Sequence, residues 1–217
     1  MKPVPQRPRR ALPRLLLLLS LLLPALAWSA PPAQEGRDYA LIDGGAPWQP
    51  LDGRIEVVEV FAYWCGHCAR FQPMIDKWKR TLPRDVRFTP VPLPSGREDA
   101  FARGYFATRD AGALEKVHAP LFIAVHERKA VPTNPSIGEL AAWYGEQGLD
   151  ARKLGAAMAR PELADRLAAA RQFAIRSGVE GTPTLIVNGR YRILADSFDE
   201  LLEHADAVIA QLRAAPR

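Results

Sequence analysis

The chain has 217 residues and a mass of 24.0 kDa, and its 48% hydrophobic and 24% charged residues exclude a disordered protein. Its formal net charge is +5. Five basic residues lie in the first 27 residues, which contain no acidic residue. The 24 basic residues beyond this segment balance the chain's 24 acidic residues. That remainder lacks the positive charge that neutralises phosphates, so we expect no nucleic-acid partner.

The N-terminal segment has the order of a secretory signal peptide. Basic residues precede an apolar run over residues 15–23, and the small-residue sequence Ala25-Leu26-Ala27 follows. The run is shorter than the ~20 residues that a membrane-spanning helix needs. We expect residues 1–27 to be a signal peptide, cleaved after Ala27 or after Ser29. An uncleaved membrane anchor is the alternative.

The first predicted strand runs from Ile55 to Phe61, and its near-continuous apolar character indicates burial on both faces. The segment before it, from Pro31 to Pro50, is rich in proline and glycine and is interpreted as irregular. A helix is predicted from Ala69 to Leu82, with an interruption at Pro73. A second strand is predicted from Val86 to Leu93.

Strand signals then disappear for about 85 residues, and helical periodicity replaces them. Three apolar stripes predict helices, the first with a break at Pro120 and the third opened by Pro161. The stripes consist of Leu114, Val117, Leu121, Phe122 and Val125, of Ile137, Leu140, Ala141 and Tyr144, and of Leu163, Leu167, Ala170 and Ala174.

Strands return over residues 184–187 and 191–194, joined by Asn188-Gly189, a dipeptide typical of a two-residue hairpin turn. A last amphipathic helix carries apolar residues from Phe198 to Leu212. Neither segment that flanks the helical block makes a sheet alone, so the block is interpreted as an insertion. The predicted domains are residues 28–94 with 178–217, and an inserted all-helical domain of residues 95–177.

Both cysteines of the chain lie in the motif Cys65-Gly66-His67-Cys68, directly after the buried strand. A disulfide that closes so short a loop removes little chain entropy, so the pair indicates redox chemistry. Unpaired N–H groups at a helix start stabilise a thiolate, so Cys65 is expected to be exposed and attacking. Cys68, one turn further, is expected to be shielded and resolving. The imidazole of His67 is expected to donate a hydrogen bond to the Cys65 thiolate.

A zinc site is the alternative interpretation of this motif, but tetrahedral zinc needs four ligands. The other histidines, His118, His126 and His204, show no ligand spacing and are interpreted as helix-surface residues. We expect no metal and no other cofactor.

Two further features accompany the motif. Glu59 interrupts the apolar strand six residues before Cys65, and a buried carboxylate is costly unless it is paired or functional. It could accept the proton of Cys68, or it could lie at the sheet edge in contact with water. Pro183, in Gly181-Thr182-Pro183-Thr184, lacks a ladder donor, so the strand begins after it or the peptide is cis. A cis proline would free backbone groups for an extended substrate, whereas a simple turn is the alternative.

These features resemble the thioredoxin fold: a strand that leads to Trp64 and the CxxC motif, Pro73 five residues later, and Thr182-Pro183 before a strand. The helical insertion, the segment Ala119-Pro120-Leu121-Phe122 and the signal peptide narrow the resemblance to the periplasmic DsbA-type thiol:disulfide oxidoreductases. The resemblance covers residues 39–212. It implies an α/β thioredoxin fold with an inserted all-helical domain, and an enzyme that introduces disulfide bonds into exported proteins.

The resemblance also implies a role for each matching residue. It makes Cys65 the nucleophile, Cys68 the resolving thiol and partner in a redox-active disulfide, His67 the thiolate-stabilising residue, Glu59 the buried acid, and Pro183 a cis proline that binds substrate together with Thr182. It implies periplasmic location, reduced unfolded client proteins as substrates, and reoxidation by a membrane partner resembling the quinone-linked DsbB. We expect a monomer.

Three positions differ from the pattern of that family. Gly66 stands where proline is frequent, Thr182 stands where valine is frequent, and Pro90 occupies a position where members can carry a lysine beside the buried acid. An isomerase or a reductase is therefore an alternative within the same class of enzyme. A peptide-binding chaperone is the alternative from another class. Replacing Cys65 with serine separates the two classes, because a pure binder would keep its activity.

Overall fold

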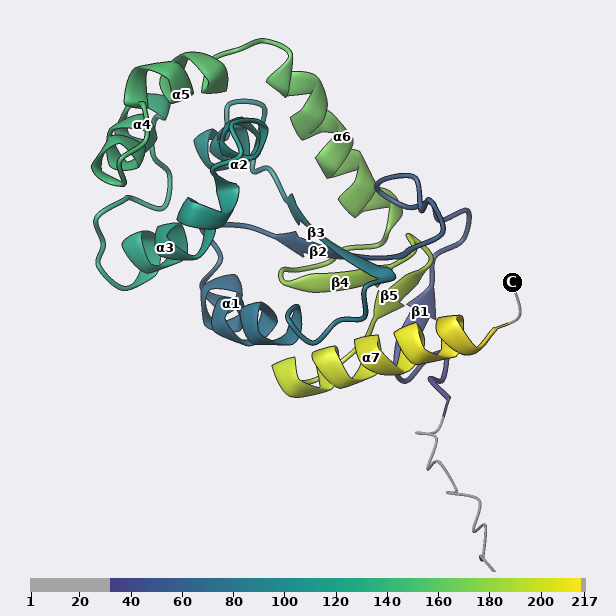
Figure 1. The fold of residues 1–217 in the computed structure, drawn as a ribbon. Helices are drawn as coiled ribbons and strands as arrows, with labels where there is room; N and C mark the ends of the chain where they lie inside the picture. The colour runs from purple at the N-terminus through teal and green to yellow at the C-terminus, as the bar shows by residue number, and fades with distance from the viewer. Residues whose placement is uncertain (1–31, 216–217) are drawn as a thin grey trace, which may run out of the picture. The chain divides into compact units, whose positions relative to one another are not determined.

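The computed structural model describes residues 32–215, so the predicted signal peptide and both cleavage positions lie outside the described residues. The described strands form one sheet in the order β1-β5-β4-β2-β3 (Figure 1). β2 pairs with β3 in parallel and with β4 antiparallel, and β5 is antiparallel to both β4 and β1. The strands are β1 (Tyr39–Leu41), β2 (Ile55–Phe61), β3 (Val86–Pro92), β4 (Thr184–Val187) and β5 (Tyr191–Ile193).

β2 is a central strand, as its composition predicts. Val57, Val58, Val60 and Phe61 are all 0% exposed. Val57 belongs to the core beneath α1 and α7, whereas Val58 and Val60 belong to the core shared with the helices of the other face. This burial on both faces fixes the strand that leads directly into the CxxC motif.

The helices divide between the two faces of the sheet, as Figure 1 shows for α1 and α7 on one side and α2 and α6 on the other. Five helices separate β3 from β4 in the chain, which confirms the helical insertion; the domain limits at 95 and 177 stay a prediction. Among residues 32–215, no helix is both long and apolar enough to cross a membrane. The helices are α1 (Gly66–Trp78), α2 (Ala100–Asp110), α3 (Leu114–His126), α4 (Ile137–Glu146), α5 (Ala151–Met158), α6 (Leu163–Arg176) and α7 (Phe198–Ala214).

The predicted breaks at two prolines are wrong. α1 continues through Pro73 and α3 continues through Pro120. The fixed φ of proline is compatible with a helix, and each proline removes one backbone hydrogen bond. Packing of both helices against the core compensates for that loss: Phe71 and Ile75 of α1 are 0% and 1% exposed, and Leu121 of α3 is 0% exposed.

Three short or atypical elements escape the sequence patterns. β1 lies within the segment interpreted as irregular, and its three residues are too few to show a period. α2 is buried along residues 100–108, including Arg103 and Thr108, so the contrast between an apolar and an exposed polar side does not mark it. α5 has only eight residues.

The predicted hairpin is confirmed between β4 and β5. Asn188 and Gly189 both have positive φ, at 50° and 66°, which is the backbone of a type I′ turn. The Asn188 side chain also accepts a hydrogen bond from the Glu56 backbone N–H at 2.8 Å, and so ties the turn to β2. Asparagine and glycine are the residues that this turn favours, which is why the sequence identifies it.

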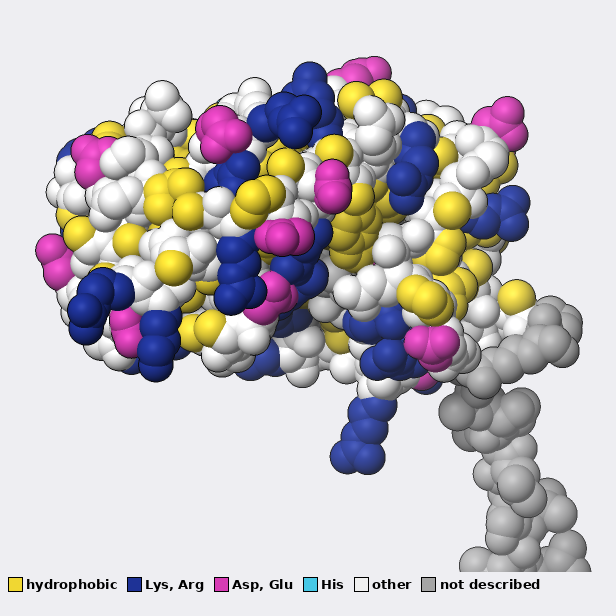
Figure 2. Space-filling view, turned by 90° about the horizontal axis from the view of Figure 1, so that it is seen from above, with side chains coloured by type: hydrophobic (Ala, Val, Ile, Leu, Met, Phe, Trp, Pro, Cys, Tyr) yellow, Lys and Arg dark blue, Asp and Glu magenta, His cyan; other side chains and the backbone are white. Residues whose placement is uncertain are grey.

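The surface carries charges of both signs. Figure 2 shows Lys and Arg side chains interspersed with Asp and Glu side chains on the face that lies uppermost in Figure 1. This mixture agrees with the balance of 24 acidic residues against the basic residues beyond the N-terminal segment.

Candidate active site

Cys65 occupies the N-cap position of α1. β2 ends at Phe61, a turn follows, and the Cys65 N–H donates to the carbonyl of Ala62 at 3.1 Å. Its backbone is extended, with φ −84° and ψ 115°, and the helix begins at Gly66. No side-chain oxygen caps α1. The first N–H groups of the helix are therefore available to the Cys65 sulfur.

The surroundings of Cys65 stabilise its thiolate. The pKa of the Cys65 thiol is lowered from 9.0 to about 5, chiefly by a hydrogen bond from the Cys68 thiol. The Thr182 hydroxyl and the backbone N–H groups of Cys68 and His67 lower it further, and partial burial opposes them. When protonated, the Cys65 thiol donates to the Thr182 carbonyl oxygen at 3.2 Å. This half-buried sulfur is therefore ionised at neutral pH.

Cys68 has the opposite character. It is 1% exposed, and its pKa is raised, first because its proton is held in the hydrogen bond to Cys65, then by burial and by the charge of Glu59. The two cysteines are not joined by a disulfide in the structure. The structure thus places one reactive and one shielded sulfur a single helical turn apart.

His67 contributes to the site through its backbone and its ring. Its backbone N–H stabilises the Cys65 thiolate, whereas a hydrogen bond from its imidazole stays a prediction. Its ring lies edge-on to Phe198 at the start of α7, with the centroids 6.5 Å apart. The imidazole therefore forms part of the wall of a groove.

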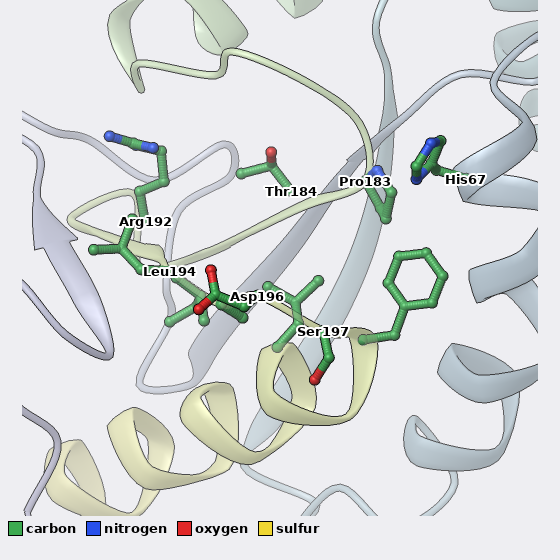
Figure 3. Close-up of a pocket in the computed structure, with 11 residues that line it drawn as sticks. His67, Pro183, Thr184, Arg192, Leu194, Asp196 and Ser197 are labelled. Carbon is green, nitrogen blue, oxygen red and sulfur yellow. The ribbon is translucent and has the colours of Figure 1, made fainter.

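That groove runs from the motif along the end of the sheet. It has a volume of about 520 Å³, and Figure 3 shows His67 and Pro183 at one end and Arg192 at the other. The peptide between Thr182 and Pro183 is cis, and β4 begins at the next residue. The loop from Leu194 to Ser197 forms the opposite wall. The role of Thr182 and Pro183 in binding an extended substrate stays a prediction.

Glu59 is buried beneath the motif rather than solvated at a sheet edge. It is 1% exposed, and its Oε2 has no hydrogen-bond partner among the described residues. The pKa of its carboxyl is raised from 4.5 to about 8, chiefly by burial and further by Asp76, while Lys79 opposes the rise. Glu59 is therefore largely protonated at neutral pH, and where it is ionised its negative charge further raises the pKa of Cys68.

The predicted position opposite Glu59 is also confirmed, since Pro90 is its partner in the register of β2 and β3. Lys79 at the C-cap of α1 supplies a nearby cation instead, and it bonds Asp76 at 2.7 Å. Both residues line a cavity of about 210 Å³ together with Glu59. Sequence reasoning missed this pair, although Gln72, Asp76 and Lys79 continue from Cys68 along one face of α1 at steps of three or four residues.

The interpretation of the three other histidines as surface residues is wrong. His118 is 8% exposed and contacts Tyr63, and His126 is half-buried and also bonds Tyr63. His204 is half-buried and donates to the Leu194 carbonyl at 2.6 Å. The partner of His118 and His126 lies 55 and 63 residues away in the chain, and that of His204 lies ten residues before it, outside its helix. Periodicity within one helix cannot reveal such contacts. Among residues 32–215, no three His, Cys, Asp or Glu side chains are grouped so as to hold a metal ion.

A thioredoxin-like sheet, a helix that starts on a low-pKa cysteine, and a cis proline beside that sulfur together define a dithiol–disulfide exchange protein. Comparison with known proteins narrows this class. Residues 86–206 match the family model of the DSBA-like thioredoxin domain, and residues 51–99 match that of thioredoxin. The chain belongs to the DSBA-like thioredoxin family.

Individual relatives support the same assignment. The chain is 31% identical over 207 residues to the thiol:disulfide interchange protein DsbA of Bordetella parapertussis, covering 92% of this chain and 96% of that protein. It is 32% identical over 187 residues to the DsbA of Pseudomonas aeruginosa, covering 84% and 87%. The crystal structure of the oxidoreductase DsbA from Xylella fastidiosa superposes with a TM-score of 0.80 and 40% identity, over 84% of this chain and 98% of that one. The chain is thus a thiol:disulfide oxidoreductase of the disulfide-introducing type.

Proposed function

We propose that this oxidoreductase works in the bacterial periplasm as a monomeric dithiol oxidase, with Cys65 as the exchanging thiol and Cys68 as the resolving thiol. The observation that carries the proposal is the asymmetry of the two sulfurs. Cys65 is half-buried with a pKa of about 5, whereas Cys68 is buried with a raised pKa. A thiolate that is stable in the protein is a good leaving group, so the dithiol form is favoured.

The reaction begins with the Cys65–Cys68 disulfide. A client thiolate attacks Cys65 Sγ, the bond between client sulfur and Cys65 forms, and the bond between Cys65 and Cys68 breaks. Cys68 leaves with the electron pair and takes a proton, for which the protonated carboxyl of Glu59 is the nearby source. A second client thiolate then attacks the client sulfur of the mixed disulfide and releases Cys65 as a thiolate. The client loses two electrons and the enzyme gains them.

The enzyme must then be reoxidised. We propose a quinone-linked membrane partner resembling DsbB, which accepts the two electrons. Cys68 gives up its proton to Glu59 in the fraction of molecules in which that carboxyl is ionised. The basic and apolar N-terminal segment, proposed to be a signal peptide of residues 1–27, would deliver the chain to that compartment. Incubating reduced protein with bacterial membranes should restore the disulfide only when quinone is present.

The division of labour is tested by trapping. Cys68→Ser should accumulate mixed disulfides with reduced unfolded clients through Cys65, because the resolving thiol is gone. Cys65→Ser is the matched control and should trap almost nothing, because Cys68 is 1% exposed. Equal trapping by the two variants would show that these roles are wrong.

The direction of exchange needs a second measurement. At equilibrium with reduced and oxidised glutathione, the dithiol form of the protein should predominate under conditions in which an ordinary protein disulfide persists. If the disulfide form predominated instead, the chain would be a reductase.

A further inference from the structure

Helix α3 contacts the active-site turn at Tyr63, two residues before Cys65. The Tyr63 hydroxyl lies 2.6 Å from His118 Nδ1, and the Tyr63 backbone carbonyl accepts from His126 Nε2 at 2.7 Å. The two histidines are eight residues apart on α3, so they lie on the same side of the helix. Two side chains from the inserted helices thus bond both polar ends of one residue of the turn.

The surroundings of Tyr63, His118 and His126 determine which atom donates each hydrogen bond. His118 is buried, and burial lowers its pKa to about 4, so its neutral ring accepts the hydrogen bond of the Tyr63 hydroxyl. Burial raises the pKa of Tyr63, which keeps the phenol as the donor. A carbonyl can only accept, so His126 Nε2 carries the proton of that hydrogen bond. His126 Nδ1 then faces Gly66, where a Cβ would lie 3.9 Å away.

The His126 ring therefore spans the turn from Tyr63 to Gly66, with Cys65 between them. The turn is also held by aromatic packing. The Tyr63 and Phe122 rings have centroids 4.9 Å apart, and the Phe61 and His118 rings lie edge-on at 5.0 Å. These contacts leave Tyr63 1% exposed. The residues on both sides of Cys65, Tyr63 and Gly66, are thus in contact with α3.

We propose that His118 and His126 are positioning residues that fix the turn carrying Cys65, and thereby set its equilibrium between disulfide and dithiol. Helix α1 stabilises the Cys65 thiolate only while the sulfur lies over the N–H groups of His67 and Cys68. A turn released at Tyr63 would let the sulfur move from those donors. The proposal rests on the role of Cys65 given above.

His126 offers a variant pair that separates positioning from packing. His126→Leu removes the donor to the Tyr63 carbonyl, whereas His126→Gln keeps an amide N–H at about the place of Nε2. The pKa of Cys65 is read from the ultraviolet absorbance of the thiolate, and the redox equilibrium is measured against glutathione. His126→Leu should raise the pKa by about one unit, and so shift the equilibrium about tenfold toward the disulfide. His126→Gln should restore most of both values.

Tyrosine supplies a second matched pair, which remains usable if His126→Leu does not fold. Tyr63→Phe removes the hydroxyl that donates a hydrogen bond to His118. It should raise the pKa of Cys65 and shift the redox equilibrium toward the disulfide, both to a smaller extent than His126→Leu. Tyr144→Phe removes a buried hydroxyl that has no partner among the described residues, and it should leave both values unchanged. Melting temperatures of all variants report the loss of packing separately.

The outcomes distinguish a failure of the positioning role of the histidines from a failure of the role proposed for Cys65. The His126 and Tyr63 variants could lower the melting temperature, yet change the pKa of Cys65 by less than about 0.3 units and its redox equilibrium by less than about twofold. The histidines would then be merely structural and the inference wrong. A wild-type Cys65 with the pKa of an ordinary thiol would instead overturn the assigned role of Cys65 itself.

Discussion

Glu59 should make the folded protein less stable as the pH rises. Its carboxyl has a pKa of about 8 in the folded chain against 4.5 for an ordinary glutamate, so between these values the folded state binds more protons than the unfolded state. Stability therefore falls with increasing pH across this window. At pH 7 the loss is about 2.5 pH units at 1.36 kcal/mol each, or about 3 kcal/mol. The side chain is 1% exposed, so solvent screens little of it.

Glu59→Gln removes the ionisable group and keeps the shape. The free energy of unfolding of both proteins is measured in urea under reducing conditions, from pH 4 to pH 8. Taking the difference between the two proteins cancels the titration of every other group that they share. Between pH 4 and pH 7, the free energy of unfolding of the variant should rise by about 3 kcal/mol relative to that of the wild type. Glu56→Gln is the matched control, since that buried carboxylate bonds Arg87 at 2.9 Å and its loss should destabilise the protein. A Glu59→Gln difference that does not change with pH would refute the claim that Glu59 is protonated at neutral pH.

Three further predictions concern the surroundings of this site and the core. Lys79→Met should raise the pKa of Glu59 and Asp76→Asn should lower it, measured as opposite displacements of the stability profile just described. The melting temperature of the dithiol form relative to the disulfide form should fall from pH 7 to pH 4, because the stabilisation by the Cys65 thiolate is lost as the pH falls through about 5. An unchanged difference in melting temperature would contradict the low pKa of Cys65. Gly104→Ala should cost about 1–3 kcal/mol in urea unfolding, because its Cβ would lie 2.6 Å from Tyr144 Oη and 2.8 Å from Leu140 Cδ2; a neutral effect would show that α2 and α4 can separate.

The features that could be predicted from the sequence are those specified by neighbouring residues. Continuous apolar residues identified β2, Asn188-Gly189 identified the hairpin turn, and the spacing of Cys65 and Cys68 identified the dithiol at a helix start. The partners of Glu59 were not predicted, because Lys79 and Asp76 reach its cavity only once α1 packs on the sheet. The hydrogen bonds that join Tyr63 to His118 and His126 span 55 and 63 residues of the chain. Such contacts leave no local signal.

The two prolines of β3 have a consequence for a protein that oxidises other proteins. β3 lies at the edge of the sheet, and the N–H of Leu93 donates inward to the Phe61 carbonyl. By alternation along the strand, the backbone N–H positions of Pro90 and Pro92 are on the outward side, where proline has no donor. The Pro90 carbonyl already accepts from the Tyr105 hydroxyl. An extended client chain that met this edge would find few free hydrogen-bonding groups, so β3 cannot readily serve as a template for intermolecular β-aggregation.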